Sequence, residues 1–507
     1  MSRRFLAVRH GLAVALILAA ASPVLAAAKA SNGAIPQRPE QLRYPALDFE
    51  VPPAAPFYHE LAGGIPVYVA EDHTLPLVTV SITLRAGSFL EGGEVGPGVA
   101  ALTGTMIRQG GTAQRSAEEF DEKVDFLAAD INTTGGDISS GANLNCITGV
   151  LDEGLGLFFE MLKTPGFDGG RLDVAKSNLL EGMKQRNDDA GQILDREWQW
   201  LLYGHDYFGS KQLTADELAA IGRDDLIAFH DRYWRPENMI ITVSGDVDTK
   251  DVLAKLGKQL ASWPGNGTAA AWPPPEPDFK PTAGLYHYEK DIPQAKVFIG
   301  HQGLEWQDWD DPDAAPLQVM NEIFGAGGFT SRLVKRIRSD EGLAYSAGSV
   351  FTIEPFRPGQ FYMLFQSKNS TVALASKIAL EELARIRDEP VSDEELKIAK
   401  QSLVETFPRR FESPRAVVRV YAQDTFQGRP HEYWQKWRDR IRAVTAEDVQ
   451  RVAKRYLDPD GLVFLVVGPW EQIAPGDADH RADMNLFFGG KVTDLPQLDP
   501  LSLEPVP

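Results

Sequence analysis

Along this chain, segments in which hydrophobic positions recur every second residue alternate with segments that have the hydrophobic spacing of a helix. The runs IPVYVAED (65–72) and LVTVSITLRAG (77–87) alternate with a period of two and predict the strands of a hairpin. In the next stretch, 96–111, apolar residues recur at Val99, Leu102 and Met106, a spacing that predicts a helix with one buried face. An amphipathic helix at 117–128, strands within 130–149 and a helix at 152–165 follow.

An internal repeat extends this pattern to the second half of the chain. The stretches 225–245 and 448–468 align without a gap at an offset of 223 residues, with identities that include Tyr233 with Tyr456 and Gly245 with Gly468. Each reads as an amphipathic helix, a proline turn and a hydrophobic strand, so the chain is predicted to hold two related halves. The fold class is therefore α+β, with helices packed on a mostly antiparallel sheet in each half.

Proline-rich sequence separates the two halves. We expect a first domain at 45–263, an extended and exposed linker at 264–282, and a second domain at 283–480. The last stretch, 481–507, is assigned to a tail, and its part after Gly489 is polar and rich in proline, so it is predicted to be loosely held.

The N-terminus has the composition of an export signal. Basic residues precede a short apolar run that ends in small residues, which predicts a signal peptide at 1–26 with cleavage near Ala26 or Ala28. A retained membrane anchor is the alternative. If the signal peptide is cleaved, the protein is expected in the periplasm. No membrane attachment would then remain, because no later run approaches the roughly 18 apolar residues of a spanning helix.

Charge and cysteine content narrow the classes of function. The formal net charge of −20 argues against nucleic acid as a partner. The single cysteine, Cys146, cannot form an internal disulfide, and its place in an alternating run predicts a small packed side chain.

The order of several segments resembles the M16 peptidase family, which includes insulinase, pitrilysin and the mitochondrial processing peptidase. These segments are a strand ending LRAGS, the GPGVAAL…GGT helix after it, and SRLVKRIRSDEGLAYSAGSVF at 331–351. In catalytic members that helix carries H-x-x-E-H, whose two histidines bind zinc while the glutamate polarises the bound water. Here Ala101, Gly104 and Thr105 occupy these positions, so the resemblance implies that this chain holds no metal.

Other residues do not replace the lost motif. None of the nine histidines forms H-x-x-E-H or H-E-x-x-H. Glu181 falls near the position of the family's distal carboxylate ligand, but one carboxylate does not hold zinc, and a solvated helix residue is the simpler interpretation.

The resemblance assigns a role to the second half instead. Many members carry an arginine and a tyrosine seven residues apart that bind the substrate backbone and stabilise the developing oxyanion, and Arg338 and Tyr345 have this spacing. The alternative is a surface arginine and a packed tyrosine. The glycines of FGAGGFTSRL, Gly325, Gly327 and Gly328, are expected either in a substrate loop or in a plain turn.

The predicted function is a zinc-less subunit of a heteromeric periplasmic M16 metallopeptidase. It would bind peptide and complete the active site of a partner that carries H-x-x-E-H and the zinc, and it would be inactive alone. A non-enzymatic M16-like scaffold of the cell envelope, an independent zinc peptidase and a periplasmic binding protein are the alternatives.

Overall fold

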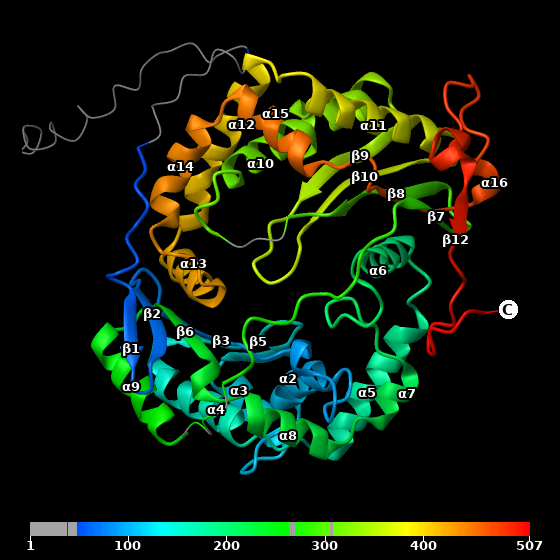
Figure 1. Cartoon of the computed structure of the whole chain (residues 1–507). Helices are drawn as coiled ribbons and strands as arrows, with labels where there is room; N and C mark the ends of the chain where they lie inside the picture. Colours follow the sequence, from blue (N-terminus) through cyan, green and yellow to red (C-terminus); the bar gives the residue numbers. More distant parts are fainter. Residues whose placement is uncertain are drawn as a thin grey trace, which may run out of the picture. The chain divides into compact units, whose positions relative to one another are not determined.

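The structure, a computed structural model, describes Arg38 and residues 48–506, except 264, 266, 268 and 305–307. The chain divides between Phe49 and Glu50, and all the labelled helices and strands lie in the second unit, Glu50–Pro507 (Figure 1). The predicted signal peptide at 1–26 lies outside the described residues. Within the described part, no helix combines the length and the apolar character needed to cross a membrane.

Two six-stranded sheets form the framework of the second unit (Figure 1). The strands of the first sheet are β1 (Tyr58–Leu61), β2 (Ile65–Glu71), β3 (Leu77–Leu84), β4 (Asp130–Gly135), β5 (Ser140–Ile147) and β6 (Met239–Gly245). Those of the second are β7 (Gly284–Tyr288), β8 (Gln294–Gln302), β9 (Ala344–Phe351), β10 (Gln360–Lys368), β11 (Val463–Val467) and β12 (Val492–Asp494).

The two sheets share one topology over five of their six strands and differ in the remaining edge strand, since β1 is antiparallel to β2 and β12 is parallel to β7. The first has the order β1-β2-β6-β3-β5-β4 and the second β12-β7-β11-β8-β10-β9. In both, the second and third strands pair in parallel and the remaining inner pairs are antiparallel. The repeated stretches form the same elements, since a helix leads into β6 in one and into β11 in the other. The predicted α+β fold with two related halves is therefore confirmed.

Helices cover both sheets. The first half holds α2 (Val99–Gln109), α3 (Ala117–Phe126), α4 (Leu151–Lys163), α5 (Gly169–Lys184), α6 (Ala190–Tyr203), α7 (Ala215–Ala220), α8 (Arg223–Tyr233) and α9 (Thr249–Ala261). The second holds α10 (Ala314–Asn321), α11 (Val372–Asp388), α12 (Asp393–Thr406), α13 (Pro414–Gln427), α14 (Tyr433–Ala443), α15 (Ala446–Tyr456) and α16 (Trp470–Ile473).

Each half lends one helix to the sheet of the other. Helix α6 packs against β8 and β11 of the second sheet, and α13 packs against β2 and β6 of the first (Figure 1). Trp198 of α6 donates a hydrogen bond to Gln360 of β10 (2.8 Å), and Arg85, just after β3, donates one to the carbonyl of Thr425 in α13 (3.0 Å). These two exchanged helices tie the halves together.

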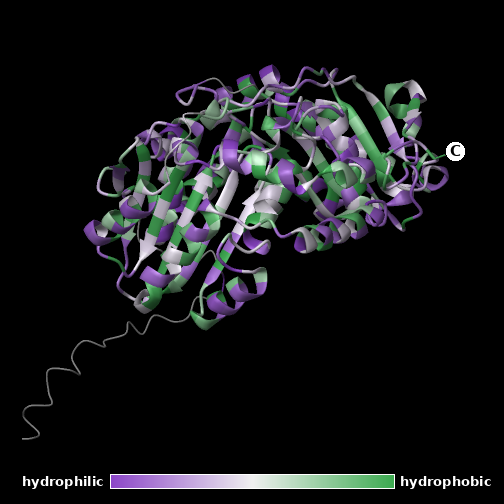
Figure 2. Ribbon diagram, turned by 90° about the horizontal axis from the view of Figure 1, so that it is seen from below, coloured by the Kyte–Doolittle hydropathy of each residue, from purple (hydrophilic) through white to green (hydrophobic). Residues whose placement is uncertain are grey.

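The burial of side chains along the strands explains why the sheets form. Along β3 and β5 every second side chain is buried, and the all-apolar strand β11 is buried throughout. Figure 2 shows this distribution, with green and white on most strands and purple on helices and loops. Cys146 of β5 lies in the core of the first half, as predicted.

The predicted hairpin of β2 and β3 is wrong. Both strands form, but β6 lies between them, parallel to β2 and antiparallel to β3. Strand β6 reads MIITVSG and is buried along nearly its whole length, so it takes a central place that a two-stranded hairpin would leave to solvent.

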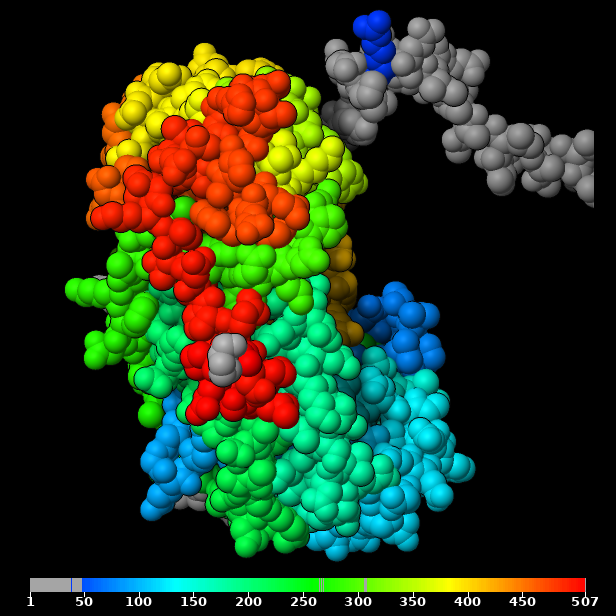
Figure 3. Space-filling model, turned by 90° about the vertical axis from the view of Figure 1, so that its right-hand side faces the viewer, coloured from blue at the N-terminus to red at the C-terminus, as the bar shows by residue number. Residues whose placement is uncertain are grey.

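The predicted loosely held tail is also wrong. Strand β12 extends the second sheet by pairing in parallel with β7, and Leu498 is buried. The carbonyls of Leu498 and Leu501 accept hydrogen bonds from Asn187 (2.7 Å) and from the backbone of Ala215 (2.8 Å) in the first half. Figure 3 shows the red C-terminal segment lying across the surface of the earlier helices.

The linker forms no helix or strand among its described residues, but it is not exposed throughout. The ring of Trp272 packs between Phe356, at a centroid distance of 4.6 Å, and Phe426 of α13, at 4.9 Å. Because these partners belong to the second half, the linker contributes to the contact between the halves.

Candidate functional site

Helix α2 holds the three positions of the expected zinc motif but has no histidine or glutamate side chain. The carboxylate of Glu91 caps its N-terminus by accepting hydrogen bonds from the backbone of Gly98 (3.1 Å) and Ala100 (2.8 Å). The predicted stripe of Val99, Leu102 and Met106 is buried. The helix is therefore held in place independently of any metal.

The three motif positions of α2 have different surroundings. Ala101 is exposed, and Thr105 is half-buried with its hydroxyl donating to the carbonyl of Ala101 (3.1 Å). Gly104 is buried against β4, where a Cβ atom would lie only 2.1 Å from the backbone nitrogen of Gly135. The reverse also holds, because a Cβ on Gly135 would lie 2.1 Å from the carbonyl oxygen of Ala100. The backbone of β4 thus occupies the space where a side chain at 104 would begin.

The described residues contain no group of three or more histidine, cysteine, aspartate or glutamate side chains that could hold a metal ion. Glu181, near the position of the distal ligand, is exposed on α5 and pairs with Lys184 at 2.7 Å. Its surroundings are those of an ordinary surface ion pair.

In the second half, Arg338 and Tyr345 are brought together at the edge of the sheet. Arg338 lies in the π-helical turn η7 (Val334–Asp340), which is anchored by buried Val334 and Ile337. The chain then turns at Gly342, whose φ of +63° favours glycine, and enters the edge strand β9. The centre of the Arg338 guanidinium lies 4.3 Å from the centroid of the Tyr345 ring.

A register shift in β9 explains the direction of the tyrosine side chain. Ala344 pairs with Ser367 and Ser346 pairs with Gln366, so Tyr345 is the extra residue of a β-bulge. Bulges turn a side chain out of the regular alternation and are frequent beside functional sites. The ring of Tyr345 is 83% exposed, which is unusual for a tyrosine on a strand.

A third residue, which the sequence prediction does not include, completes this cluster. Phe329 in the turn η6 (Gly328–Thr330) has its ring centroid 4.5 Å from the Arg338 guanidinium and is 66% exposed. The Arg338 guanidinium therefore contacts two exposed aromatic rings, one from the turn η6 that precedes η7 and one from the strand β9 that follows it. We call Phe329, Arg338 and Tyr345 the aromatic–arginine cluster.

The three glycines of the expected loop have separate surroundings. Gly325 does not lie in a loop but in the buried π-helical turn η5 (Glu322–Ala326), where a Cβ would meet the backbone nitrogen of Ser349 in β9 at 2.4 Å. Gly327 donates its N–H to the carbonyl of Glu322, and Gly328 adopts a φ of +60° immediately before Phe329. Gly325 thus lets η5 approach β9 closely, as Gly104 does for α2 and β4.

An ion pair fixes the start of the segment that carries Arg338. Arg332 is buried and donates two hydrogen bonds to the carboxylate of Glu395 in α12, at 2.7 and 3.2 Å. Burial acts to raise the pKa of Glu395, but hydrogen bonds from Arg332 and Ser392 outweigh it and bring the pKa to about 2.

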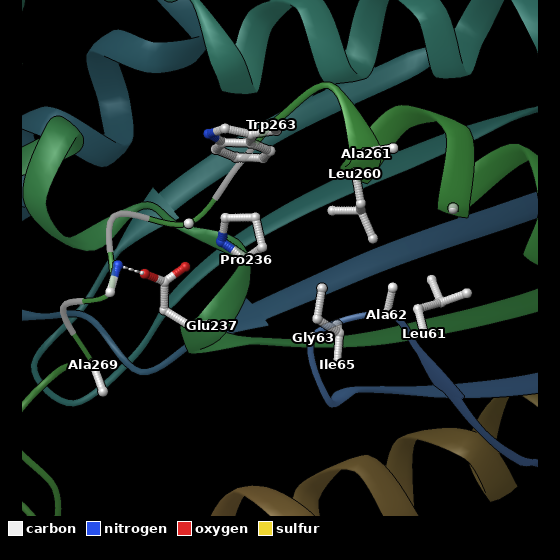
Figure 4. Close-up of a pocket in the computed structure, with 13 residues that line it drawn as sticks. Leu61, Ala62, Gly63, Ile65, Pro236, Glu237, Leu260, Ala261, Trp263 and Ala269 are labelled. Carbon is white, nitrogen blue, oxygen red and sulfur yellow. Dashed lines mark hydrogen bonds between the residues drawn. The ribbon is translucent and has the colours of Figure 1, made fainter.

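A pocket of about 550 Å³ lies elsewhere, beside β1, β2 and the C-terminal end of α9 (Figure 4). Its lining is mostly apolar, with Leu61, Leu260 and Trp263 among the side chains. Among its described lining residues only Glu237 is charged, and its carboxylate accepts an N–H from Gly267 at 3.0 Å. Such a lining offers apolar contact and little chemistry.

Comparison with known proteins adds independent evidence. Residues 220–403 match the family described as Peptidase M16 inactive domain. The Non-peptidase homolog YmxG of Helicobacter pylori is 24% identical over 407 residues, which cover 80% of this chain and 91% of that protein. The crystal structure of a peptidase M16 inactive domain from Pseudomonas fluorescens superimposes with a TM-score of 0.72 at 26% identity, over 81% of this chain and 97% of that one.

Residues 220–403 thus match the M16 inactive domain, and the chain is similar to M16 homologues over about 80% of its length. As an M16 homologue it keeps the two-half fold, while α2 lacks the side chains that bind zinc in catalytic members. The periplasmic protease PqqL from Escherichia coli shares the fold, with a TM-score of 0.66 at 15% identity over 81% of this chain and 46% of that one.

Proposed function

We propose that this M16 homologue is a non-catalytic subunit that completes the cleavage site of a separate, zinc-bearing M16 partner. It binds the peptide substrate and contributes Arg338 and Tyr345, while the partner supplies H-x-x-E-H and the metal. Zinc bound by the partner would activate water for attack on the peptide carbonyl. The chain alone is then without peptidase activity.

The aromatic–arginine cluster is the observation that carries this proposal. Two aromatic rings with more than half of their surface exposed surround a guanidinium that makes no hydrogen bond or ion pair to any described residue. Arginine has five N–H donors in a fixed plane, so these donors remain available for an external carbonyl or carboxylate. Exposed aromatic and arginine side chains of this kind are typical of residues that dominate binding energy at interfaces.

The geometry suits support of an oxyanion. The rings hold the guanidinium in one orientation before any ligand binds, which lowers the entropy cost of binding. A phenol and a guanidinium both donate to an oxygen whose negative charge grows during cleavage. The bulge at Tyr345 and the two π-helical turns η5 and η7 beside β9 are irregularities of the kind that recur at functional sites.

The periplasm is the proposed location. This rests on the signal peptide predicted at 1–26, and the periplasmic protease PqqL is one protein of the same fold that works there. Cleavage of the signal would release the chain from the membrane.

Reconstitution with a zinc-bearing homologue from the same organism tests the proposal. The wild-type chain is titrated into the H-x-x-E-H homologue, and cleavage of a fluorescence-quenched peptide is followed. We expect a large increase in rate with the wild-type chain, and a loss of about tenfold to a thousandfold of that increase with Arg338→Ala, as for loss of an oxyanion donor. Tyr345→Phe tests the phenol separately.

A matched control separates the cluster from general surface effects. Arg442→Ala with Tyr58→Phe removes an exposed guanidinium and a phenol elsewhere on the same chain. This control should support cleavage as the wild type does. If the partner cleaves equally well without the chain, or if Arg338→Ala and Tyr345→Phe support it fully, the proposal is wrong and an M16-like scaffold becomes the better account.

A further inference from the structure

A cleft of about 880 Å³ lies between the two halves of the fold and apart from the aromatic–arginine cluster. One wall is the face of the first sheet that does not point into the core, with Ser81, Thr83, Asn143 and Thr242. The opposite wall is formed by η9 (Phe407–Phe411) and the exchanged helix α13. Its volume falls in the range of pockets that take a small molecule or a short peptide.

The wall from η9 and α13 is strongly basic. Five arginines and one glutamate, Glu412, line the cleft, although the chain as a whole carries a formal charge of −20. An acidic protein that gathers arginines in one concave surface creates a local positive potential, which attracts anions.

Three of these arginines have no partner within the described part of the chain. Arg409, Arg415 and Arg419 are exposed and make no hydrogen bond or ion pair there. The remaining two, Arg410 and Arg429, lie over the ring of Trp434 at 4.5 and 4.8 Å. Arg429 also pairs with buried Asp424 at 2.9 Å, so its charge is already compensated. Arg409, Arg415 and Arg419 therefore make none of these contacts, and they are the guanidinium groups most open to a ligand.

The spacing of these arginines matches an extended chain. Arg415 and Arg419 are four residues apart on α13 and so lie on one face, about 6 Å apart along the helix axis. Side chains on one face of an extended peptide recur every second residue, about 6.6 Å apart. Carboxylates at alternate positions of such a peptide would thus face the two guanidinium groups in turn.

The wall formed by the first sheet can bind the backbone of a peptide whose carboxylates face the arginines. The hydroxyls of Ser81, Thr83 and Thr242 and the amide of Asn143 can donate to or accept from a peptide backbone. Ser81 already donates to Asn143 at 2.5 Å, so the polar surface is ordered across two strands. A compact inorganic anion would use the arginines but leave this wall unused.

We infer that this cleft binds an extended acidic peptide segment, with carboxylates at alternate positions paired to Arg415 and Arg419 and with Arg409 beside them. This names the substrate class of the proposed peptide-binding subunit, and in that respect it rests on the proposed function. The cleft selects the peptide segment by its negative charge. It lies apart from the aromatic–arginine cluster, which is proposed to act in the cleavage step.

Fluorescence anisotropy with the full chain alone tests this inference. The probe is a labelled short peptide of alternating threonine and glutamate, and the comparison peptide has glutamine in place of every glutamate. We expect the glutamate peptide to bind about tenfold more tightly or better, with an affinity that falls as salt is added. The variant Arg415→Gln/Arg419→Gln should lose this preference.

Lys250→Gln/Lys258→Gln is the matched control, because it removes two exposed positive charges from helix α9, which lies outside the cleft. It should bind as the wild type does, and melting curves show whether each variant is folded. Equal binding of the two peptides by the wild-type chain, or an unchanged preference in the Arg415→Gln/Arg419→Gln variant, would overturn the inference. So would displacement of the probe by inorganic phosphate as readily as by unlabelled glutamate peptide at equal ionic strength. No partner takes part in this assay, so its failure leaves the role of Arg338 and Tyr345 standing, and failure of the reconstitution leaves this assay unaffected.

Discussion

Substitution of Gly104 tests directly why α2 carries no zinc-binding side chains. A Cβ atom at this position would lie 2.1 Å from the nitrogen of Gly135 and 2.4 Å from the carbonyl carbon of Thr134. Ordinary contact begins at 3.4 Å, so α2 or β4 would have to move by about 1.3 Å. Both contacting atoms belong to the backbone of a paired strand, which no rotamer change can relieve.

Gly104→Ala is therefore expected to destabilise the fold. Glycine to alanine inside a helix normally stabilises by about 0.5–1 kcal/mol. Here overpacking against β4 should outweigh that gain and lower the free energy of unfolding by about 3 kcal/mol, the upper end of the usual range. Gly156→Ala in α4 is the matched control, because a Cβ there meets nothing within 4 Å and should give the ordinary small gain.

Unfolding in urea, followed by far-ultraviolet circular dichroism, measures both variants. Opposite shifts of the two unfolding midpoints would support the close contact of α2 and β4. If Gly104→Ala were as stable as Gly156→Ala, the space beside α2 would be open and the explanation wrong. For the same reason, restoring histidine, glutamate and histidine at 101, 104 and 105 should damage folding rather than create a zinc site.

Three further predictions follow from burial and pairing. Because the pKa of Glu395 is lowered to about 2, below its ordinary 4.5, its contribution to stability is present above pH 4.5 and disappears as the pH falls toward 2. Since solvent screens this partly exposed carboxylate, Glu395→Gln should cost about 1–2 kcal/mol at neutral pH and remove this part of the acid dependence of the melting temperature. If both stay unchanged, Arg332 is held by other contacts. A chain that ends at Gly490 should melt at a lower temperature and aggregate more readily, since loss of β12 leaves β7 as an open edge; an unchanged melting curve would contradict the part given to β12. Burial raises the pKa of the Cys146 thiol to about 11, so a disulfide reagent should modify no thiol in the native chain and one after unfolding, and rapid native modification would show that the core is open.

The sequence pattern anticipates the framework well where one signal is repeated. The helix, proline turn and strand of 225–245 recur at 448–468, and this repeat anticipates two sheets that share the arrangement of five strands. The pattern cannot order the strands, because β6 reaches its place between β2 and β3 from far along the chain. It also misjudges 491–506, where a few hydrogen bonds and one short strand hold a polar segment that composition alone suggests is loose.

The site is only partly visible in the sequence. The resemblance to M16 peptidases singles out Arg338 and Tyr345, but their stacking depends on a bulge that no local pattern encodes. Phe329 leaves a weak signal, since a large apolar residue directly after two glycines is well placed to be exposed. The basic cleft leaves a stronger one in FPRRFESPRAVVRV, where four arginines cluster in an acidic chain, yet only the exchange of α13 brings them to the first sheet.

Metal analysis of the purified chain tests the central claim most directly. Zinc content is measured by mass spectrometry on the full chain, together with peptide hydrolysis before and after addition of a chelator. We expect no stoichiometric zinc and no hydrolysis that the chelator abolishes, because α2 carries Ala101, Gly104 and Thr105. One zinc ion per chain with peptidase activity that the chelator removes would contradict it.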